Sequence, residues 1–383
     1  MSPIYLDYNA TTPVDAAVLD AMLPYLRGEF GNPSSAHGLG SRAHDAVEAA
    51  RAEVAALIGA APDEIVFTGG GTEASNMAIR GAVRIDDTRR DVVTSTIEHP
   101  ATEACSAFLE SEGHKVTWVP AKANGLIDPA RVAAVIDNKT ALVTIIHAQN
   151  EIGTIQLVAD IAAAARHHGA LVHVDAAQSV GKIAVNVEEL GADLLSIAGH
   201  KLYAPKGVGV LYIRRGISLP PLLLGAGQER GRRPGTENVP YIVGLGEACR
   251  IAGAMLERES KRLSALAGDL FAALKREIPG IMLVGHPTQG LPNTLNVLFP
   301  NASGRKVLEN CRRVMASTGS ACHADSEEPS AILTALGIAR NHALGAVRLS
   351  LGRGTTKQDV TDAGADLAAA WRSVLAAPAV AAE

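Results

Sequence analysis

The 383-residue sequence has few aromatic side chains and no strong charge of either sign. Only 3% of its residues are Phe, Trp or Tyr although 47% are hydrophobic, so alanine, valine and leucine must fill most of the core. The formal net charge is −5, which argues against a nucleic acid as partner.

Cysteine is also scarce, and long apolar runs are missing. The four cysteines, Cys105, Cys249, Cys311 and Cys322, are widely spaced and form no CxxC pair. This pattern indicates neither a disulfide framework nor a metal site, and it fits a reducing cytoplasm. No secretory signal is visible, and no apolar run approaches the ~18 residues of a membrane span. We therefore expect a cytoplasmic protein without a metal site or a membrane contact.

Short apolar runs alternate with helical periodicity through the first two thirds of the chain. This alternation predicts an α/β fold, with a mostly parallel central sheet and helices on both faces. Strands are expected at 64–68, 92–95, 115–119, 141–147, 171–175, 194–198 and 208–213, and helices at 15–26, 41–58, 101–112, 129–136 and 158–168.

The pattern changes after Leu222. A Gly- and Arg-rich loop, whose charged stretch 229–233 is expected to be solvated, leads into a long helix at 239–277. Strands near 282–284, 294–299, 314–317 and 347–351 and a last helix at 357–375 predict a smaller α+β unit. We expect a large domain of residues 15–245 and a small domain of residues 1–14 and 246–383.

The segment 194–213 reads as strand, turn and strand around Gly199-His200-Lys201. Lys201 then stands where a strand opens onto a loop. A lysine there loses part of its hydration, which lowers its pKa and makes the amine nucleophilic. A lone lysine is more often a surface residue, so this interpretation depends on other residues.

Three further patterns place polar groups at strand ends. Gly69-Gly-Gly-Thr72 joins a strand to a helix, where backbone N–H groups face an anion, although a turn without a ligand has the same pattern. Asp175 closes a strand and suits a protonated ring nitrogen or a helix N-cap. His99 has a similar position. Together with an amine, these are the groups that pyridoxal phosphate needs.

Cys322 and two arginines are further candidates. Cys322 lies among small and polar residues, which predicts an exposed and reactive thiol. Cys105 and Cys249 fall in helical patterns and read as core residues. Arg348 and Arg353 flank the end of the last strand, where a guanidinium either grips a carboxylate or forms an ordinary salt bridge.

Ten motifs together carry a resemblance over nearly the whole chain. They are YLDYNATTP, GNPSSAH, FTGGGTE, EHPA, NEIGT, HVDAAQ, GHKLYAPKG, GQERGRRPGTEN, GSACHAD and RLSLGR. In this order they resemble the cysteine desulfurases of the class V aminotransferase family, of the iron–sulfur cluster or nitrogenase type with a long cysteine loop. The resemblance implies the fold type I architecture of pyridoxal-phosphate-dependent transferases.

The resemblance also implies a role for each matching position. Lys201 would hold pyridoxal phosphate as a Schiff base and move a proton, His99 would stack on its ring, and Cys322 would receive sulfur as a persulfide. The other implied contacts are Gly71, Thr72 and His200 at the phosphate, Asp175 at the ring nitrogen, Gln178 at the phenolic oxygen, Thr236 at the phosphate of the other subunit, and Asn150 and Arg348 at the substrate carboxylate.

The implied reaction converts L-cysteine to L-alanine in a homodimer that hands sulfur to a scaffold protein. One position departs from the family, because Ala198 replaces a serine whose hydroxyl binds the phosphate in many members. A selenocysteine lyase acting on L-selenocysteine shares GQER…RPGTEN and ACH, so it remains an alternative. Another class V aminotransferase and a non-catalytic scaffold remain as further alternatives.

Overall fold

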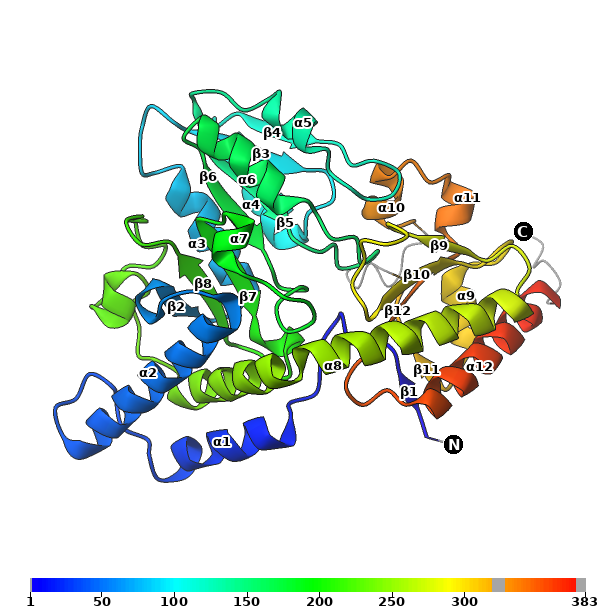
Figure 1. The fold of residues 1–383 in the computed structure, drawn as a ribbon, viewed down its shortest axis with the longest axis horizontal. Helices are drawn as coiled ribbons and strands as arrows, with labels where there is room; N and C mark the ends of the chain where they lie inside the picture. Colours follow the sequence, from blue (N-terminus) through cyan, green and yellow to red (C-terminus); the bar gives the residue numbers. More distant parts are fainter. Residues whose placement is uncertain (1, 319–327, 377–383) are drawn as a thin grey trace, which may run out of the picture.

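The computed structural model describes residues 2–318 and 328–376, and its largest element is a seven-stranded sheet (Figure 1). Only β8 runs antiparallel to its neighbours, while all other adjacent pairs are parallel. This confirms the mostly parallel sheet. In spatial order the strands are β2 (Ile65–Thr68), β8 (Gly209–Ile213), β7 (Leu194–Ala198), β6 (Leu171–Asp175), β5 (Thr140–Ile146), β3 (Asp91–Ser95) and β4 (Val116–Val119).

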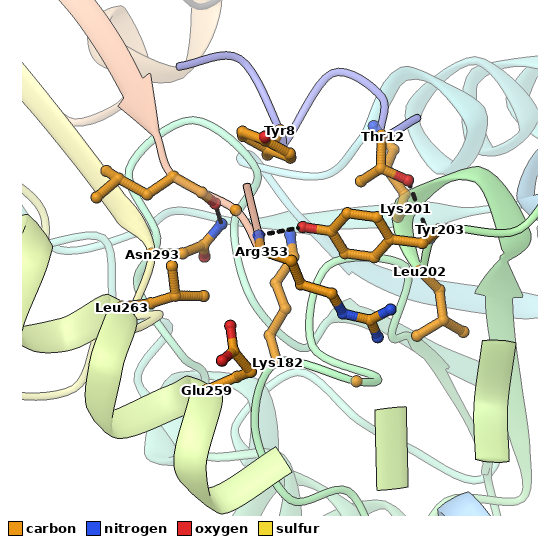
Figure 2. A pocket seen from close by; sticks show the side chains of 13 residues that line it. Tyr8, Thr12, Lys182, Lys201, Leu202, Tyr203, Glu259, Leu263, Asn293 and Arg353 are labelled. Atoms are coloured by element: carbon orange, nitrogen blue, oxygen red, sulfur yellow. Dashed lines mark hydrogen bonds between the residues drawn. The ribbon is translucent and has the colours of Figure 1, made fainter. Parts of the chain in front are cut away.

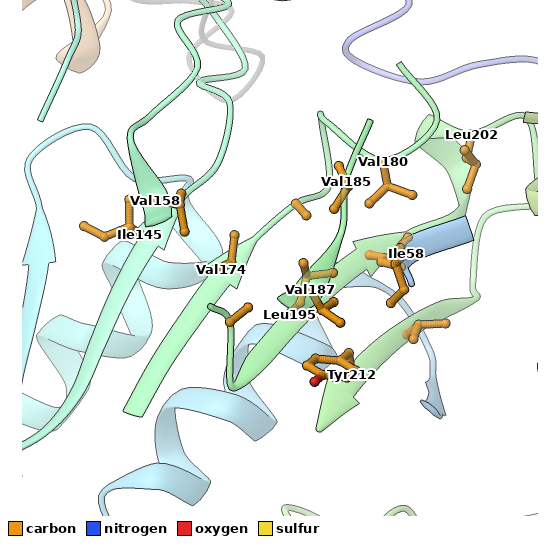
Figure 3. Packing of buried hydrophobic residues seen from close by; sticks show 14 of the residues in the cluster. Ile58, Ile145, Val158, Val174, Val180, Val185, Val187, Leu195, Leu202 and Tyr212 are labelled. Atoms are coloured by element: carbon orange, nitrogen blue, oxygen red, sulfur yellow. The ribbon is translucent and has the colours of Figure 1, made fainter. Parts of the chain in front are cut away.

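Helices cover both faces of this sheet, because alternate strand residues enter two different cores. Leu194 packs with α3 (Gly71–Ala82) and α4 (Pro100–Ser111), whereas the next residue, Leu195, packs in the opposite core. That second core, part of which Figure 3 shows, also takes residues from the helices α1 (Ala16–Arg27), α2 (Gly38–Ile58), α5 (Pro129–Ala133), α6 (Val158–His167) and α7 (Val187–Leu190). A sheet buried on both faces explains its continuous apolar strands.

A smaller unit is built around an antiparallel sheet in the order β12-β10-β9. It has its own apolar cluster, to which Leu6, Leu270 and Leu349 belong. The N-terminal strand β1 (Ile4–Tyr5) pairs with β11 (Val314–Met315), which supports grouping the N-terminus with the small domain. The other elements of this unit are β9 (Met282–Val284), β10 (Thr294–Leu298), β12 (Ala346–Ser350), α9 (Gly304–Asn310) and α12 (Lys357–Ala376). The short helices α10 (Ala331–Ala335) and α11 (Arg340–Ala343) follow α9 in the chain but bury residues in the larger core.

The helix α8 (Val239–Glu277) connects the two cores. Asn238 caps it by accepting a hydrogen bond from the backbone N–H of Tyr241. By length and composition alone, this helix could cross a membrane. Its packing against α1, α2 and α12, with 44% of the apolar window buried, is typical of a core helix.

Most predicted elements have the expected bounds within one or two residues, and the long helix matches at both ends. Two are shorter, because α5 ends at Ala133 and β11 ends at Met315, after which Ser317 forms a single bridge with Arg348. Sequence analysis missed α7, α10 and α11 and the 3-10 turns η1 (Pro62–Glu64), η2 (Gly199–Lys201) and η3 (Gln228–Gly231). Helices of four or five residues show too little periodicity to be recognised.

Candidate active site

The carboxyl ends of the parallel strands meet at one edge of the large sheet, and a cavity of about 520 Å³ lies there. In α/β proteins, ligands bind at this edge. Arg348 of β12 and Ala331 and Ile332 of α10 also belong to the wall. Nine residues predicted from the sequence line the cavity, namely Gly71, Thr72, His99, Asn150, Asp175, Gln178, His200, Lys201 and Arg348.

Lys201 ends the 3-10 turn that follows β7. A Cβ atom on Gly199 would lie 2.8 Å from the carbonyl oxygen of Val208, so only glycine fits this tight turn. The Nζ of Lys201 donates hydrogen bonds to the carbonyls of Asn9 and Ala10. Burial, reinforced by Arg348, lowers the pKa of Lys201 to about 8. Its neutral amine is therefore more populated than that of a surface lysine.

Asp175, the last residue of β6, and Gln178, three residues later, both line the cavity. Asp175 is 5% exposed, and its Oδ1 accepts a hydrogen bond of 3.0 Å from the backbone N–H of Ala177. The Nε2 of Gln178 donates to the carbonyl of Asn9 over 2.9 Å. The carboxylate and the amide thus stand on the same turn, which suits two neighbouring atoms of one ligand.

Two histidines, His99 and His200, also line the cavity. His99 caps α4, and because its Nδ1 accepts from the N–H of Ala101 at 3.1 Å, a neutral ring carries its proton on Nε2. Burial lowers the pKa of His99, which Asp175 partly opposes. Burial followed by the charge of Lys201 lowers the pKa of His200 to about 4. Both rings therefore favour the neutral form.

The N-terminus of α3 borders the cavity. Gly70 precedes it with a φ of 152°, a conformation that favours glycine. A Cβ on Gly71 would lie 3.1 Å from the Cβ of Ala198, so β7 and the helix approach closely. The unpaired N–H groups of the first helical turn form a cradle for an anion.

Of the two candidate arginines, only Arg348 lines the cavity. It is 3% exposed, forms a salt bridge of 2.7 Å with Asp7, and donates to the carbonyl of Asn150 at 3.2 Å. Its Nε is buried and has no hydrogen-bond partner within residues 2–318 and 328–376. Arg353 instead pairs with Asp15 and stacks over Tyr203, which matches the salt-bridge alternative.

Within the described residues, Thr236 is the predicted site residue that does not line this cavity. Thr236 is exposed and lines a separate depression beside Glu229 and Arg233. Cys322 lies outside the described residues, but residues on either side of its segment contact the cavity wall. The carbonyl of Ser317 accepts from the N–H of Arg348 at 2.7 Å, and the Oγ of Ser330 donates to Glu151 at 2.6 Å.

Sequence analysis missed two buried glutamates of this cavity, although each adjoins a predicted residue. Glu98 precedes His99, and burial, with a contribution from Asp175, raises the pKa of its carboxyl to about 8. Burial also raises the pKa of Glu151, which follows Asn150. Glu98 therefore tends to be protonated near neutral pH and adds little negative charge beside Asp175. The carboxylates within EHPA and NEIGT were the available signal.

The missed residue with the most contacts is Asn9, which is fully buried. Its carbonyl accepts from Lys201 and Gln178, and its side chain bonds Lys182 and the carbonyl of Asn150. Asn9 thus joins the N-terminal segment to both ends of the cavity. An asparagine inside the motif YLDYNATTP was the only signal in the sequence.

Comparisons with known proteins agree with this geometry. The family model described as aminotransferase class V matches residues 4–362. A cysteine desulfurase of Trichormus azollae is 44% identical over 94% of this chain and 90% of its own length. The cysteine desulfurase IscS of Methanosarcina thermophila is 44% identical over 93% and 89%. A solved NifS-like protein superposes with a TM-score of 0.90 at 36% identity, covering 96% of this chain and 98% of its own.

Proposed function

Because this chain belongs to the cysteine desulfurase group of the class V aminotransferases, we propose that it removes the sulfur of L-cysteine, releases L-alanine and passes the sulfur to an acceptor for iron–sulfur cluster assembly or another thiolation. The observation that carries this proposal is the arrangement of Lys201, Asp175 and Arg348 around one cavity. An amine, a carboxylate and a guanidinium in this arrangement suit an amino-acid substrate.

The cavity also fits pyridoxal phosphate. The N–H groups of the first turn of α3 suit its phosphate, with Thr72 and His200 beside them, while Asp175 would hold its ring nitrogen. Gln178 would hold its phenolic oxygen, His99 would face its ring and Lys201 would bind it covalently. When bound, the cofactor withdraws electrons from the substrate carbon atoms as long as Asp175 keeps its ring nitrogen protonated.

The protein's own residues would orient the substrate and move its protons. Arg348 has a buried donor to offer a carboxylate, and Asn150 lies next to it. Lys201, with its lowered pKa, is the base for the proton on the substrate Cα. His99, with its Nε2 proton, would exchange protons with the departing sulfur.

Cys322 would receive the sulfur. Its thiolate attacks the substrate sulfur, an S–S bond forms, and the Cβ–S bond breaks with its electron pair left on the carbon fragment. Protonation of that fragment gives L-alanine and leaves a persulfide on Cys322. The bonds of Ser317 and Ser330 to the cavity wall support this role, because they hold the neighbouring segments at the site.

A homodimer in the cytoplasm is part of the proposal. Thr236 points outside the cavity of its own chain, so it is available to the phosphate of a second copy. The three described cysteines are free thiols, which suits a reducing compartment. A scaffold protein would then accept the persulfide sulfur.

Alanine release from L-cysteine and from L-selenocysteine, in the wild type and in Cys322→Ala, tests the function. We expect the wild type to act on L-cysteine and the variant to lose that activity by at least about a hundredfold. Cys249→Ala, which removes a buried thiol, should keep it. If the wild type releases alanine from selenocysteine alone and the variant does so too, the enzyme is a selenocysteine lyase.

Ala198→Ser should tighten the binding of pyridoxal phosphate about tenfold, because a hydroxyl would add one hydrogen bond to a charged phosphate. Titration of the apo-protein with the cofactor, followed by visible absorbance, measures the dissociation constant. Ala165→Ser adds the same hydroxyl at a buried site on α6 and should leave the dissociation constant unchanged. Equal affinity in Ala198→Ser and the wild type would contradict this position of the phosphate.

A further inference from the structure

We propose that Lys182 is a positioning residue of the active site, which sets the orientation of the Gln178 and Asn9 side-chain amides toward the cofactor and substrate. The inference rests on the proposed function and deepens it. Lys182 follows Gln178 by four residues in the turn after β6. It belongs to none of the motif positions to which sequence analysis assigned a role.

The contacts of Lys182 are polar but uncharged. Its Nζ donates to the Oε1 of Gln178 at 2.6 Å and to the Oδ1 of Asn9 at 2.9 Å. Within the described part of the chain no carboxylate forms a salt bridge with it. Burial, with the positive charges of Lys201 and Arg348, lowers its pKa well below the ordinary value. Withdrawing a charged amine from water without a counter-ion is costly, and here the two amide oxygens are the groups that offset this cost.

Lys182 and Lys201 come from different segments of the chain, but their side chains border the same small cavity. Both line a second cavity, of about 30 Å³, which is large enough for a water molecule (Figure 2). Tyr8 and Glu259 are also in its wall, so it lies toward the small unit and α8. Lys182 therefore does not line the main cavity itself but contacts Gln178, which does, and Asn9.

The chemistry of the amide group gives Lys182 its effect. A side-chain amide has an accepting end and a donating end, and the Lys182 amine donates an N–H to the accepting end of each neighbouring amide. Because Lys182 occupies Oε1, the Nε2 of Gln178 must point the other way, where it now donates to Asn9. A flipped amide would present oxygen to the anionic phenolic oxygen of the cofactor and repel it.

The same lysine, together with Asn293, orients Asn9. Its Oδ1 accepts from Lys182 at 2.9 Å and from the Nδ2 of Asn293 at 3.1 Å, so its Nδ2 is turned to the carbonyl of Asn150, one of the proposed substrate-binding residues. One amine thus contacts an amide on the cofactor side and an amide on the substrate side. This explains why a lysine, with several donors, occupies the position.

Lys182→Met tests the proposal, since it keeps the length of the side chain and removes every donor. Two quantities are measured: the dissociation constant of pyridoxal phosphate, and the midpoint of the pH titration of the bound cofactor's visible absorption. We expect about tenfold weaker binding, the effect of one lost hydrogen bond, and a shifted midpoint. Lys206→Met removes an exposed lysine of the next loop and should change neither.

A double-mutant cycle separates positioning from general packing. If Lys182 acts through Gln178, then Lys182→Met adds little to the affinity loss and midpoint shift that Gln178→Leu already causes. Additive effects, or a folded Lys182→Met with wild-type affinity and midpoint, overturn the proposal. If Lys182→Met does not fold, Lys182→Gln, which retains one donor group, takes its place in the same cycle.

The same measurements separate the inference from the proposed function. A wild-type protein that binds no pyridoxal phosphate refutes the function and with it the inference. A wild type that binds the cofactor and releases alanine, beside an unchanged Lys182→Met, refutes the inference alone.

Discussion

Lys201→Ala should lower alanine release from L-cysteine by about 10⁴-fold, the upper end of the effect of one acid–base group. The variant loses the amine that bonds the carbonyls of Asn9 and Ala10, and no nearby group replaces it. Within the described residues the other amine in this region is that of Lys182, which is bonded to Gln178 and Asn9. Single-turnover release of alanine measures the effect.

Cofactor binding distinguishes this loss from misfolding. The contacts proposed for the phosphate and the ring nitrogen involve Thr72 and Asp175, so Lys201→Ala should still bind pyridoxal phosphate, without the covalent bond. Lys201→Arg keeps the charge but, with a pKa above about 12, gives no base and should be equally inactive. Residual activity above about a tenth of wild type in either variant would contradict the role of Lys201.

The sheet and the residues at its edge follow from local sequence. Strand β6 is a short apolar run that ends in Asp175, and β7 is another that leads to Lys201 through Gly199. Once strands alternate with helices, right-handed connections place these ends at one edge. The position of the cavity could therefore be predicted without any knowledge of long-range contacts.

The residues behind the site could not be predicted in that way. Asn9 meets Gln178, Lys182 and Lys201 across more than 160 positions of sequence, and nothing local indicates which amide end faces which partner. The charged loop shows the same limit. Its stretch 229–233 was expected to be solvated, but Glu229 is 8% exposed, a correction that depends on its partner in a helix far earlier in the chain.

Glu229→Ala should lower the free energy of unfolding by about 3–5 kcal/mol, because it removes the buried counter-ion of a buried arginine and leaves the partly exposed Glu48 as its charged partner. The carboxylate accepts two hydrogen bonds of 2.8 Å from Arg51 and one of 2.8 Å from the N–H of Phe67. Arg51 is 4% exposed, so water cannot replace the lost partner. Chemical denaturation of the full-length holoenzyme measures the change.

Glu48→Ala is the matched control, since Glu48 pairs with the same Arg51 at 2.9 Å but its side chain is 38% exposed. We expect a cost below about 1 kcal/mol there, because solvent screens an exposed pair. Equal losses in the two variants would show that the Glu229 pair stabilises the protein no more than a surface pair does. A larger loss in Glu229→Ala would instead indicate that this pair attaches the loop of Thr236 to the sheet. Glu229 lies only seven residues before Thr236, and its carboxylate accepts a hydrogen bond from Phe67 of β2. In the proposed homodimer, that attachment would hold the loop of one subunit in a fixed position near the phosphate of the other.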